Sequence, residues 1–274
     1  MQTLNNVQAL IIDMDGVLWN GSEALPGLQS FFKSLRRHQL AFILATNNAS
    51  LTQSQYITKL ATMGVSVSIN EILTSSMATA TYLAELVDPL STSIFVIGEQ
   101  GLRQPLTEKG FSLIDCYPCP DNKAADFVVC GLDRNLTWDK LSNASLHLNA
   151  GAKFIASNAD TSLPTERGTI LGNGAILAAL EAATQSAPTI IGKPEAIMYQ
   201  QAMKVLNVNP EYTIAIGDRL NTDILGAVNT GIRSIMVLTG ISTEADLHSI
   251  DYQPSWIMPD IQAITVALNA ALTN

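Results

Sequence analysis

Two aspartates separated by a single residue stand where an apolar segment ends. The segment Gln8–Met14 is typical of a buried strand, and Asp13 and Asp15 lie at its carboxyl end. Side chains two residues apart share one side of an extended strand, and open α/β sheets bind ligands beyond the carboxyl ends of their strands. The pair is therefore well placed for chemistry, although a polar strand end with an Asp-Gly turn has the same pattern.

A second pair of aspartates follows another apolar segment, Thr213–Ile216. Asp218 comes just after this predicted strand, and Asp223 lies in the first turn of the next predicted helix. Taken singly, each has an ordinary structural explanation, Asp218 as a turn residue and Asp223 as an acid that stabilises a helix N-terminus. If all four acids converge to ~4 Å, each pair repels by about 4 kcal/mol at an effective dielectric constant of about 20.

Such a cluster of carboxylates requires either a bound cation or protonation of one member. All its candidate ligands are oxygen atoms, because no His or Cys lies within these motifs. Oxygen ligation by a few carboxylates favours Mg²⁺ over Zn²⁺. The sequence therefore predicts a magnesium site, and the ion would supply the positive charge that a chain of net charge −9 lacks for an anionic substrate.

Two further segments contain residues suited to holding a phosphate. The predicted strand Ala41–Ala45 is followed by Thr46 and Asn47, where a hydroxyl, backbone N–H groups and a helix start could bind an anion. An ordinary N-cap loop would contain the same residues. Lys193 stands between a glycine and a proline after an apolar run, which suits a fixed position, although many such lysines are only solvated.

The segments that would position these residues alternate between apolar runs and amphipathic stretches, which favours a parallel sheet with helices on both faces. Strands are expected at Gln8–Met14, Ala41–Thr46, Thr213–Ile216 and Ser234–Leu238, and helices at Gly27–Arg37, Thr52–Met63, Ser75–Val87, Thr222–Thr230 and Ile261–Leu272. A second α/β unit is bracketed by Pro89 and Pro188. Its predicted strands are Ile94–Ile97, Phe111–Ile114, Phe127–Val129 and Phe154–Ala156, and its predicted helices are Glu99–Glu108, Trp138–Ala150 and Asn173–Thr184.

Composition and charge exclude several classes of protein. The 274 residues are 47% hydrophobic and 14% charged, which excludes a disordered or collagen-like chain and leaves room for two domains. The net charge of −9 argues against a nucleic-acid partner. No apolar stretch approaches the roughly 20 residues of a membrane span, so no membrane partner is expected. The N-terminal segment lacks a secretory pattern and three cysteines make no disulfide framework, which indicates a cytoplasmic location.

The order of these motifs resembles the haloacid dehalogenase (HAD) superfamily of phosphohydrolases. Asp-x-Asp-Gly at 13–16, a strand-end threonine, Gly-Lys-Pro at 192–194 and Gly-Asp-x-x-x-x-Asp at 217–223 occur in the family's order. Thr46 and Lys193 are 147 residues apart, whereas one βαβ step takes ~30, so an inserted domain is needed between them. This placement resembles subfamily IIA, the NagD-like p-nitrophenyl phosphatase type with a C2 α/β cap.

The resemblance implies a fold and a division into domains. The expected α/β architecture is a Rossmann-like doubly wound parallel sheet, the HAD-like catalytic core, formed by residues 1–88 and 188–274. A smaller inserted α/β cap domain, residues 89–187, would determine substrate specificity. Its candidate substrate contacts are Asn158, Asp160 and the loop Leu163–Gly168, in which Arg167 could meet an acidic substrate. An ordinary solvated loop explains each of these candidates equally well. The resemblance also implies that two chains could pair as a homodimer through the cap.

The resemblance also implies roles for the acids. Asp13 would be the catalytic nucleophile that forms an aspartyl-phosphate, and Asp15 would protonate the leaving oxygen and then activate water. Asp13, the backbone carbonyl of Asp15, and Asp218 would bind Mg²⁺, and Asp223 would support the metal directly or through water. These assignments make the four acids a single catalytic and metal-binding group.

The remaining motif residues would act on the phosphate. Thr46 and Asn47 would hold the phosphoryl oxygens, and Lys193 would stabilise both the nucleophile and the transferred group. The implied function is Mg²⁺-dependent hydrolysis of small phosphorylated metabolites, with p-nitrophenyl phosphate as a surrogate substrate. The alternatives are a phosphotransferase that uses the same intermediate, and a non-catalytic phosphate-binding or signalling protein on the same fold.

Several cysteine, tryptophan and histidine residues outside these motifs are also considered as functional candidates. Cys116 and Cys119 have the spacing of a redox pair or half a zinc site, but a loop follows them and two further ligands would be needed. We expect Trp19 to line the entrance of the site and Trp138 to fill core or edge space. His147 shows no ligand spacing, and we expect it at the surface or near a helix end.

Overall fold

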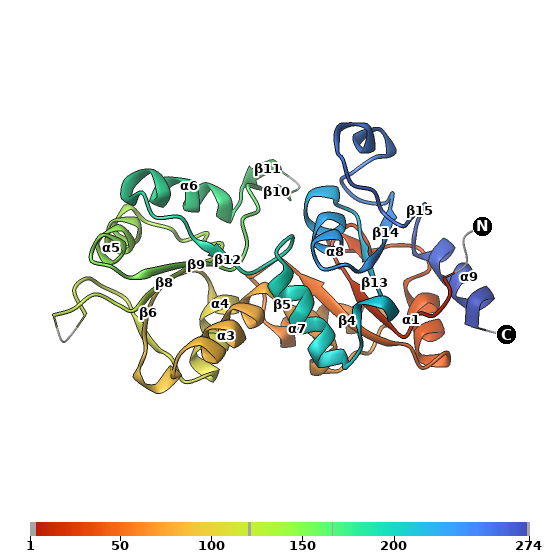
Figure 1. Cartoon of the computed structure of the whole chain (residues 1–274), viewed down its shortest axis with the longest axis horizontal. Coiled ribbons are helices and arrows are strands. Elements are labelled where there is room, and N and C mark those ends of the chain that lie inside the picture. Colours follow the sequence, from red (N-terminus) through yellow and green to blue (C-terminus); the bar gives the residue numbers. More distant parts are fainter. Residues whose placement is uncertain (1–3, 120–121, 166, 273–274) are drawn as a thin grey trace. The chain divides into compact units, whose positions relative to one another are not determined.

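The computed structural model describes residues 4–119, 122–165 and 167–272, and the chain divides into two compact units (Figure 1). The first unit consists of the chain up to Thr46, Ser54–Leu73, and the chain from Lys193 onward. The second consists of Asn47–Gln53 and Thr74–Gly192. The core and cap boundaries expected from the sequence, 1–88 with 188–274 and 89–187, stay a prediction.

The first unit is built on a sheet whose described strands follow the order β15-β14-β13-β1-β4-β5. These strands are β1 (Ala9–Ile12), β4 (Ala41–Thr46), β5 (Ile72–Thr74), β13 (Thr213–Gly217), β14 (Arg233–Val237) and β15 (Trp256–Met258). β1 pairs in parallel with β13 on one side and β4 on the other. Every residue of β1 and β13 is buried, which explains their unbroken apolar runs, because helices cover both faces of such a sheet.

The direction in which the sheet grows reverses at β1. Strands β4 and β5 extend the sheet to one side of β1, while β13, β14 and β15 extend it to the other. In a doubly wound sheet, the carboxyl ends of the strands at this reversal form the crevice in which ligands bind. The expected doubly wound α/β fold is confirmed, and β1, β4 and β13 end where a site should lie.

The helices that accompany this sheet are amphipathic. They are α1 (Leu28–Arg37), α2 (Gln53–Thr62), α7 (Ala196–Leu206), α8 (Leu225–Asn229) and α9 (Ile261–Leu272), with short 3₁₀ turns at η1 (Ile69–Glu71), η3 (Pro210–Tyr212) and η5 (Glu244–Ser249). In α1, Leu28, Phe31, Phe32 and Leu35 are buried, and their spacing places them on one helical face. The helix expected over Thr222–Thr230 instead begins as a π-helical turn, η4 (Leu220–Ile224), before α8.

The second unit has a smaller parallel sheet in the order β12-β9-β8-β6-β7. Its strands are β6 (Ser93–Ile97), β7 (Ser112–Ile114), β8 (Phe127–Cys130), β9 (Lys153–Ala156) and β12 (Thr189–Ile190). Its helices are α3 (Ser75–Leu86), α4 (Gln100–Glu108), α5 (Trp138–Asn149) and α6 (Asn173–Thr184), with a 3₁₀ turn at η2 (Pro89–Ser91). Phe95, Val128 and Leu177 belong to its apolar core, so this unit buries a core of its own.

Two antiparallel hairpins stand outside these sheets. β2 (Trp19–Asn20) and β3 (Glu23–Ala24) form one in the first unit, directly after the Asp-x-Asp-Gly motif. β10 (Ser162–Thr165) and β11 (Gly168–Leu171) form the other in the second unit. The segment Leu163–Gly168, expected to be an ordinary loop, therefore contains strand residues on both sides of position 166, which lies outside the described residues.

The burial expected for Trp138 is wrong, and the expectation for His147 holds only in part, because this residue lies in the last turn of α5 but not at the surface. Trp138 is 84% exposed, because it occupies the first turn of α5 just after the N-cap Thr137. His147 is fully buried, because its Nδ1 accepts a hydrogen bond from the backbone N–H of Ala125 at 2.9 Å and its Nε2 lies 3.1 Å from the carbonyl oxygen of Cys116. Both positions depend on packing around α5 that residue type alone does not reveal.

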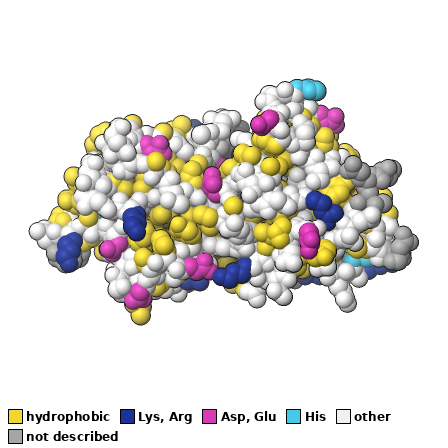
Figure 2. All heavy atoms as spheres, in the orientation of Figure 1, with side chains coloured by type: hydrophobic (Ala, Val, Ile, Leu, Met, Phe, Trp, Pro, Cys, Tyr) yellow, Lys and Arg dark blue, Asp and Glu magenta, His cyan; other side chains and the backbone are white. Residues whose placement is uncertain are grey.

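The surface carries few charges. Figure 2 shows Lys and Arg side chains standing singly on the visible face, not in a continuous basic stripe. None of the helices in the described residues has the length and apolar character needed to cross a membrane.

Candidate active site

Strand ends in the first unit deliver the candidate acids to one place. Asp13 follows β1 directly, and its backbone N–H donates to the carbonyl oxygen of Ile216 in β13 at 2.8 Å. Asp218 follows β13, and Asp223 lies in the π-helical turn η4. One carboxylate oxygen from each of the three acids lies within 4.8 Å of the others. The structure therefore brings together acids that are 205 and 210 residues apart in the sequence (218 − 13 and 223 − 13).

Asp218 sits in a cradle of backbone. A Cβ atom built on Gly16 or on Gly240 would stand 2.6 or 1.9 Å from its Oδ2, so only glycine leaves room at these positions. The same Oδ2 accepts a hydrogen bond of 2.7 Å from the backbone N–H of Ile241. Its other oxygen, Oδ1, is buried and has no hydrogen-bond partner among the described residues. The backbone thus holds Oδ2 of Asp218, and Oδ1 is the oxygen that could bind a ligand.

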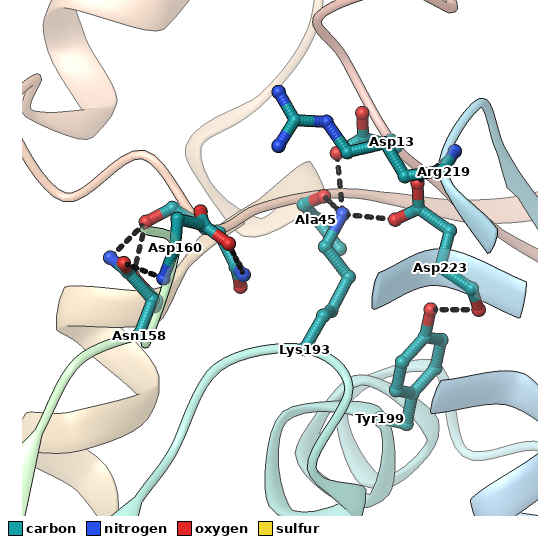
Figure 3. Close-up of polar contacts among 10 residues, drawn as sticks. Asp13, Ala45, Asn158, Asp160, Lys193, Tyr199, Arg219 and Asp223 are labelled. Carbon is teal, nitrogen blue, oxygen red and sulfur yellow. Dashed lines mark hydrogen bonds and ion pairs between the residues drawn. The ribbon is translucent and has the colours of Figure 1, made fainter. Parts of the chain in front are cut away.

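Lys193 faces two of these acids (Figure 3). Its Nζ donates to Asp13 Oδ1 at 2.5 Å, to Asp223 Oδ1 at 2.7 Å and to the carbonyl oxygen of Ala45 at 3.0 Å. The lysine is 4% exposed, so its charge is compensated inside the protein and not by water. Three acceptors for three ammonium protons fix the amine at the carboxyl end of β4.

Hydrogen bonds hold both the side chain and the backbone of Asp223. Its Oδ2 accepts from the backbone N–H of Arg219 at 3.1 Å, and its carbonyl oxygen accepts from the hydroxyl of Tyr199 in α7 at 2.9 Å. Gly217 leaves room for it, because a Cβ there would stand 2.1 Å from the Cβ of Asp223. The widened π turn directs this carboxylate back toward the strand end, as expected of a functional distortion in a helix.

Burial and charge displace the pKa values of this cluster. Burial raises the pKa of Asp13 above its ordinary value, Lys193 opposes the shift, and the charges of Asp223 and Asp218 add to it. Burial, followed by the charge of Asp223, raises the pKa of Asp218 to about 6. Burial disfavours the charged form of Lys193, but Asp13 and Asp223 outweigh it and hold its pKa above the ordinary value. The lysine therefore stays protonated.

The donor set fits a divalent cation with oxygen ligands. Three carboxylates and one ammonium leave an excess of negative charge when all are ionised, and the free Oδ1 of Asp218 provides a buried ligand atom. No His or Cys belongs to the group of side chains within ligand distance. Mg²⁺ is therefore the ion that this chemistry suits. The carboxylate of Asp15 is not one of the three.

Asp15 has a different environment. Its side chain is exposed, and its Oδ1 accepts a hydrogen bond of 2.7 Å from the indole N–H of Trp19. Trp19, expected to line the entrance, is instead fully buried and stacks on Tyr56 with ring centroids 6.5 Å apart. The side chains of Tyr56 and Thr46 are hydrogen-bonded to each other. The aromatic pair thus links the second aspartate of the motif to the strand-end threonine.

The candidate residues Asn158 and Asp160, which Figure 3 labels, form a polar cluster with Asn47 in the second unit. The side-chain amide of Asn47 donates to Asp160 Oδ1 at 3.2 Å, and that of Asn158 donates to the carbonyl oxygen of Asn47 at 2.8 Å. The side-chain amide of Asn173 donates to the carbonyl oxygens of Asn158 at 2.6 Å and of Cys130 at 3.3 Å. These bonds fix the backbone on which Asn47 stands. Arg167 is exposed, in the turn before β11.

Several residues that hold the site were not predicted from the sequence. Tyr199, Ile241 and Gly240 contact the acids, and Asn173 supports Asn158. Helical spacing of apolar residues predicts the helix that carries Tyr199, but not the contact of its hydroxyl. The backbone N–H of Ile241 has no signal in the sequence, because any residue would supply it.

Known proteins resemble this chain along most of its length. A family model described as haloacid dehalogenase-like hydrolase matches residues 10–112, and a HAD-hydrolase-like model matches residues 190–264. An acid sugar phosphatase of Staphylococcus haemolyticus is 34% identical over 258 residues, which cover 94% of this chain and 95% of that protein. The 5'-nucleotidase YutF of Bacillus subtilis is 34% identical over 262 residues, covering 93% and 99%.

Solved structures give the same result. The crystal structure of 4-nitrophenylphosphatase from Thermotoga maritima matches with a TM-score of 0.90 and 32% identity, covering 98% of this chain and all of that one (100%). The matched fold includes both the core sheet and the smaller sheet. The chain therefore belongs to the haloacid dehalogenase-like hydrolases, in the branch that contains NagD and the p-nitrophenyl phosphatases, and it is a phosphatase.

Proposed function

We propose that this protein is a Mg²⁺-dependent phosphomonoester hydrolase that acts on small phosphorylated metabolites through an aspartyl-phosphate on Asp13. The observation that carries the proposal is the buried group in which Lys193 contacts Asp13 at 2.5 Å and Asp223 at 2.7 Å beside Asp218. A fixed ammonium next to a carboxylate at the end of β1 suits an attack on phosphorus, because phosphoryl transfer needs chiefly positioning and charge neutralisation.

The first step is transfer of the phosphoryl group to the protein. An oxygen of Asp13 forms a bond to phosphorus, and the bond from phosphorus to the ester oxygen breaks with its electron pair on that oxygen. Asp15 donates its carboxylic proton to this oxygen, so that a neutral alcohol leaves. Lys193 neutralises charge on Asp13 and on the transferred group, and Thr46 with the Asn47 backbone holds phosphoryl oxygens.

The second step is hydrolysis of the aspartyl-phosphate. Asp15, now a carboxylate, takes a proton from water, whose oxygen attacks phosphorus. The bond between phosphorus and the Asp13 oxygen breaks, which restores the Asp13 carboxylate and releases inorganic phosphate. Asp15 ends the cycle as a carboxylic acid, as it began.

Asp13, Asp218, the backbone carbonyl of Asp15, and Asp223 directly or through water are the groups proposed to hold Mg²⁺. The ion would neutralise negative charge on the phosphoryl oxygens and on the acids that surround it. The buried Oδ1 of Asp218, which lacks a hydrogen-bond partner among the described residues, supports this assignment.

The names of the relatives support a proposal for the substrate class. The curated relatives are named for sugar phosphates and for nucleoside 5'-phosphates, so these two classes are the proposed substrates, with p-nitrophenyl phosphate as a surrogate. We propose that residues 89–187 act as the cap, that Asn158, Asp160 and Arg167 help to select the leaving group, and that two chains pair through this cap in the cytoplasm. If an alcohol replaced water in the second step, the protein would be a phosphotransferase.

The test is a screen of the purified protein with Mg²⁺ against a panel of sugar phosphates and nucleoside monophosphates, measured as phosphate release. Asp13→Asn should lower turnover by about 10⁴-fold or more while the protein stays folded, because the nucleophile is gone. Substantial residual activity in Asp13→Asn would exclude covalent catalysis at this residue. Turnover that needs an added alcohol would favour the phosphotransferase, and no turnover on any ester would favour a non-catalytic phosphate-binding protein.

A further inference from the structure

The carboxylate of Asp15 is exposed and is held by one buried side chain. The indole N–H of Trp19 donates to Asp15 Oδ1 at 2.7 Å, and Trp19 is fully buried. An exposed carboxylate on a short side chain is free to change rotamer, whereas a buried indole is not. The hydrogen bond to the buried indole of Trp19 therefore restricts the rotamer of the Asp15 carboxylate, which burial does not fix.

The indole is clamped by α2. Tyr56 stacks on it at an interplanar angle of 22°, and Lys59 places its Nζ 4.2 Å from the ring centroid. That amine also donates to the carbonyl oxygen of Gly21 at 2.9 Å, so it is tied to the hairpin that carries Trp19. A cation over an indole face at this distance is attractive, and the ring is contacted by two residues three positions apart on one helix.

Backbone contacts also hold the segment Asp15–Trp19 together. The N–H of Gly16 donates to the carbonyl oxygen of Trp19 at 2.8 Å, and Asp15 and Trp19 form an isolated β-bridge. Gly16 has a φ of 81°, which permits the tight return of the chain. Residues four apart are thus fixed to each other through both the backbone and the side chains.

We propose that Trp19 is a positioning residue that sets the orientation of the Asp15 carboxylate. The inference rests on the proposed role of Asp15 as the proton donor and acceptor. Because the indole engages Oδ1, Oδ2 is the oxygen presented to the ester oxygen in the first step and to water in the second. A general acid must stand within hydrogen-bond reach of the atom that it protonates, so loss of the N–H should matter most where the leaving group needs a proton.

Trp19→Phe is the decisive variant, because it keeps an aromatic ring between Tyr56 and Lys59 but removes the N–H. We expect kcat/KM for phenyl phosphate to fall about 10- to 100-fold, a large part of the usual contribution of a general acid, and kcat/KM for p-nitrophenyl phosphate to fall less than about 3-fold. p-Nitrophenolate leaves readily without a proton, so the ratio of the two losses reports protonation. Trp138→Phe makes the same replacement at an exposed site and should leave both values unchanged.

Equal losses on the two esters, or no loss, in Trp19→Phe would overturn the proposal, because a merely structural defect does not depend on the leaving group. A wild-type protein that hydrolyses neither ester would instead contradict the proposed function.

A second measurement tests the contact without any turnover and serves if Trp19→Phe does not fold. The chain has three tryptophans, so ¹⁵N-labelled indole groups give three N–H resonances. Asp15→Ala should shift the Trp19 resonance and speed its exchange with solvent, and should leave those of Trp138 and Trp256 in place. An unchanged Trp19 resonance would contradict the hydrogen bond and the proposal with it.

Discussion

Each compact unit contains a buried polar cluster, and the two are held by different forces. In the first unit, Lys193 is paired with Asp13 and Asp223, and all three are charged groups withdrawn from water. In the second unit, Asn158 and Asn173 are joined by amide-to-carbonyl hydrogen bonds, and Asp160 supplies a single carboxylate. One cluster depends on the balance of charge, and the other on matched donors and acceptors.

The difference explains how strictly each cluster restricts its residues. Removing one partner of a buried ion pair leaves an uncompensated charge and costs about 3–5 kcal/mol, whereas an unsatisfied buried amide or carbonyl costs about 1–3 kcal/mol. The ionic cluster therefore admits few residue types and makes a recognisable motif. The amide cluster can be rebuilt in many ways, which suits the proposed role of this region in selecting the substrate.

Removal of the proposed metal should give the largest effect, because it acts on the ionic cluster of the first unit and not on the amide cluster of the second. Chelation should eliminate turnover and lower the melting temperature, because an ion that binds only the folded state stabilises it by about 2.7 kcal/mol at 100 times its Kd. Ca²⁺ should inhibit, since it takes more ligands at longer distances than Mg²⁺. Calorimetry with and without Mg²⁺ measures the shift, and full activity after chelation would contradict the metal site.

Removal of the buried ammonium should have the next largest effect. Lys193→Met leaves Asp13 and Asp223 unpaired, and we expect the metal-free variant to lose about 3–5 kcal/mol of unfolding free energy in urea. Mg²⁺ should restore part of the loss. The matched control is Arg103→Met in the second unit, whose guanidinium contacts Asp115 at 2.8 Å. The Arg103 and Asp115 side chains are 30% and 77% exposed, so the variant should lose under about 1 kcal/mol. Equal losses of unfolding free energy in the two variants would contradict the expected difference between a buried and an exposed ion pair.

The amide cluster should respond more mildly. Asn173→Ala removes the donor to the carbonyl oxygens of Asn158 and Cys130, and we expect a loss of about 1–3 kcal/mol of unfolding free energy. Turnover of p-nitrophenyl phosphate should persist, while the preference among larger esters should change. Asn173→Asp, which keeps the size but places a buried carboxylate against the same two carbonyl oxygens, should lose more than Asn173→Ala. Abolished turnover at unchanged stability would contradict a supporting role.

The smallest effect should come from an ion pair at the surface of the second unit. Arg134 holds the pKa of Glu99 below the ordinary glutamate value of 4.5, with partial burial opposing it. Because the pKa is lower in the folded state, the pair stabilises the fold above pH ~4.5 and loses this contribution as the pH falls through the folded value. At pH 7, Glu99→Gln should cost under about 1 kcal/mol, screened by salt. The difference in melting temperature from wild type should shrink as the pH falls below about 4.5, and a difference that stays constant with pH would refute the pair.

Much of the fold and of the ionic cluster could be predicted from the sequence. Unbroken apolar runs identified β1, β4 and β13, and polar residues at their carboxyl ends identified Asp13, Thr46 and Asp218. These signals are local, and the topology of parallel sheets converts them into proximity. β5 (Ile72–Thr74) and β15 (Trp256–Met258) were not predicted. Strands of three residues carry little pattern, although β7, of the same length, was predicted.

The contacts around Asp15 could not be predicted in this way. Trp19 meets Asp15 only because Gly16 turns the chain and α2 covers the indole, and neither event appears in the spacing of residue types. His147 likewise accepts a backbone N–H from a loop 22 residues away in sequence. Side-chain identity gives the chemistry that a residue offers, and packing decides which partner receives it.

If Asp218 binds the proposed Mg²⁺, the glycines beside it make the affinity for the ion depend on backbone clearance as well as on the ligands. One added methyl group at Gly240 would stand 1.9 Å from Asp218 Oδ2 and would force the carboxylate out of place. A relative could thus retain every acid of the motifs and still lose its ion. An inventory of acids alone therefore cannot separate active from silent members of this group, and the small residues that make room for them belong in any such survey.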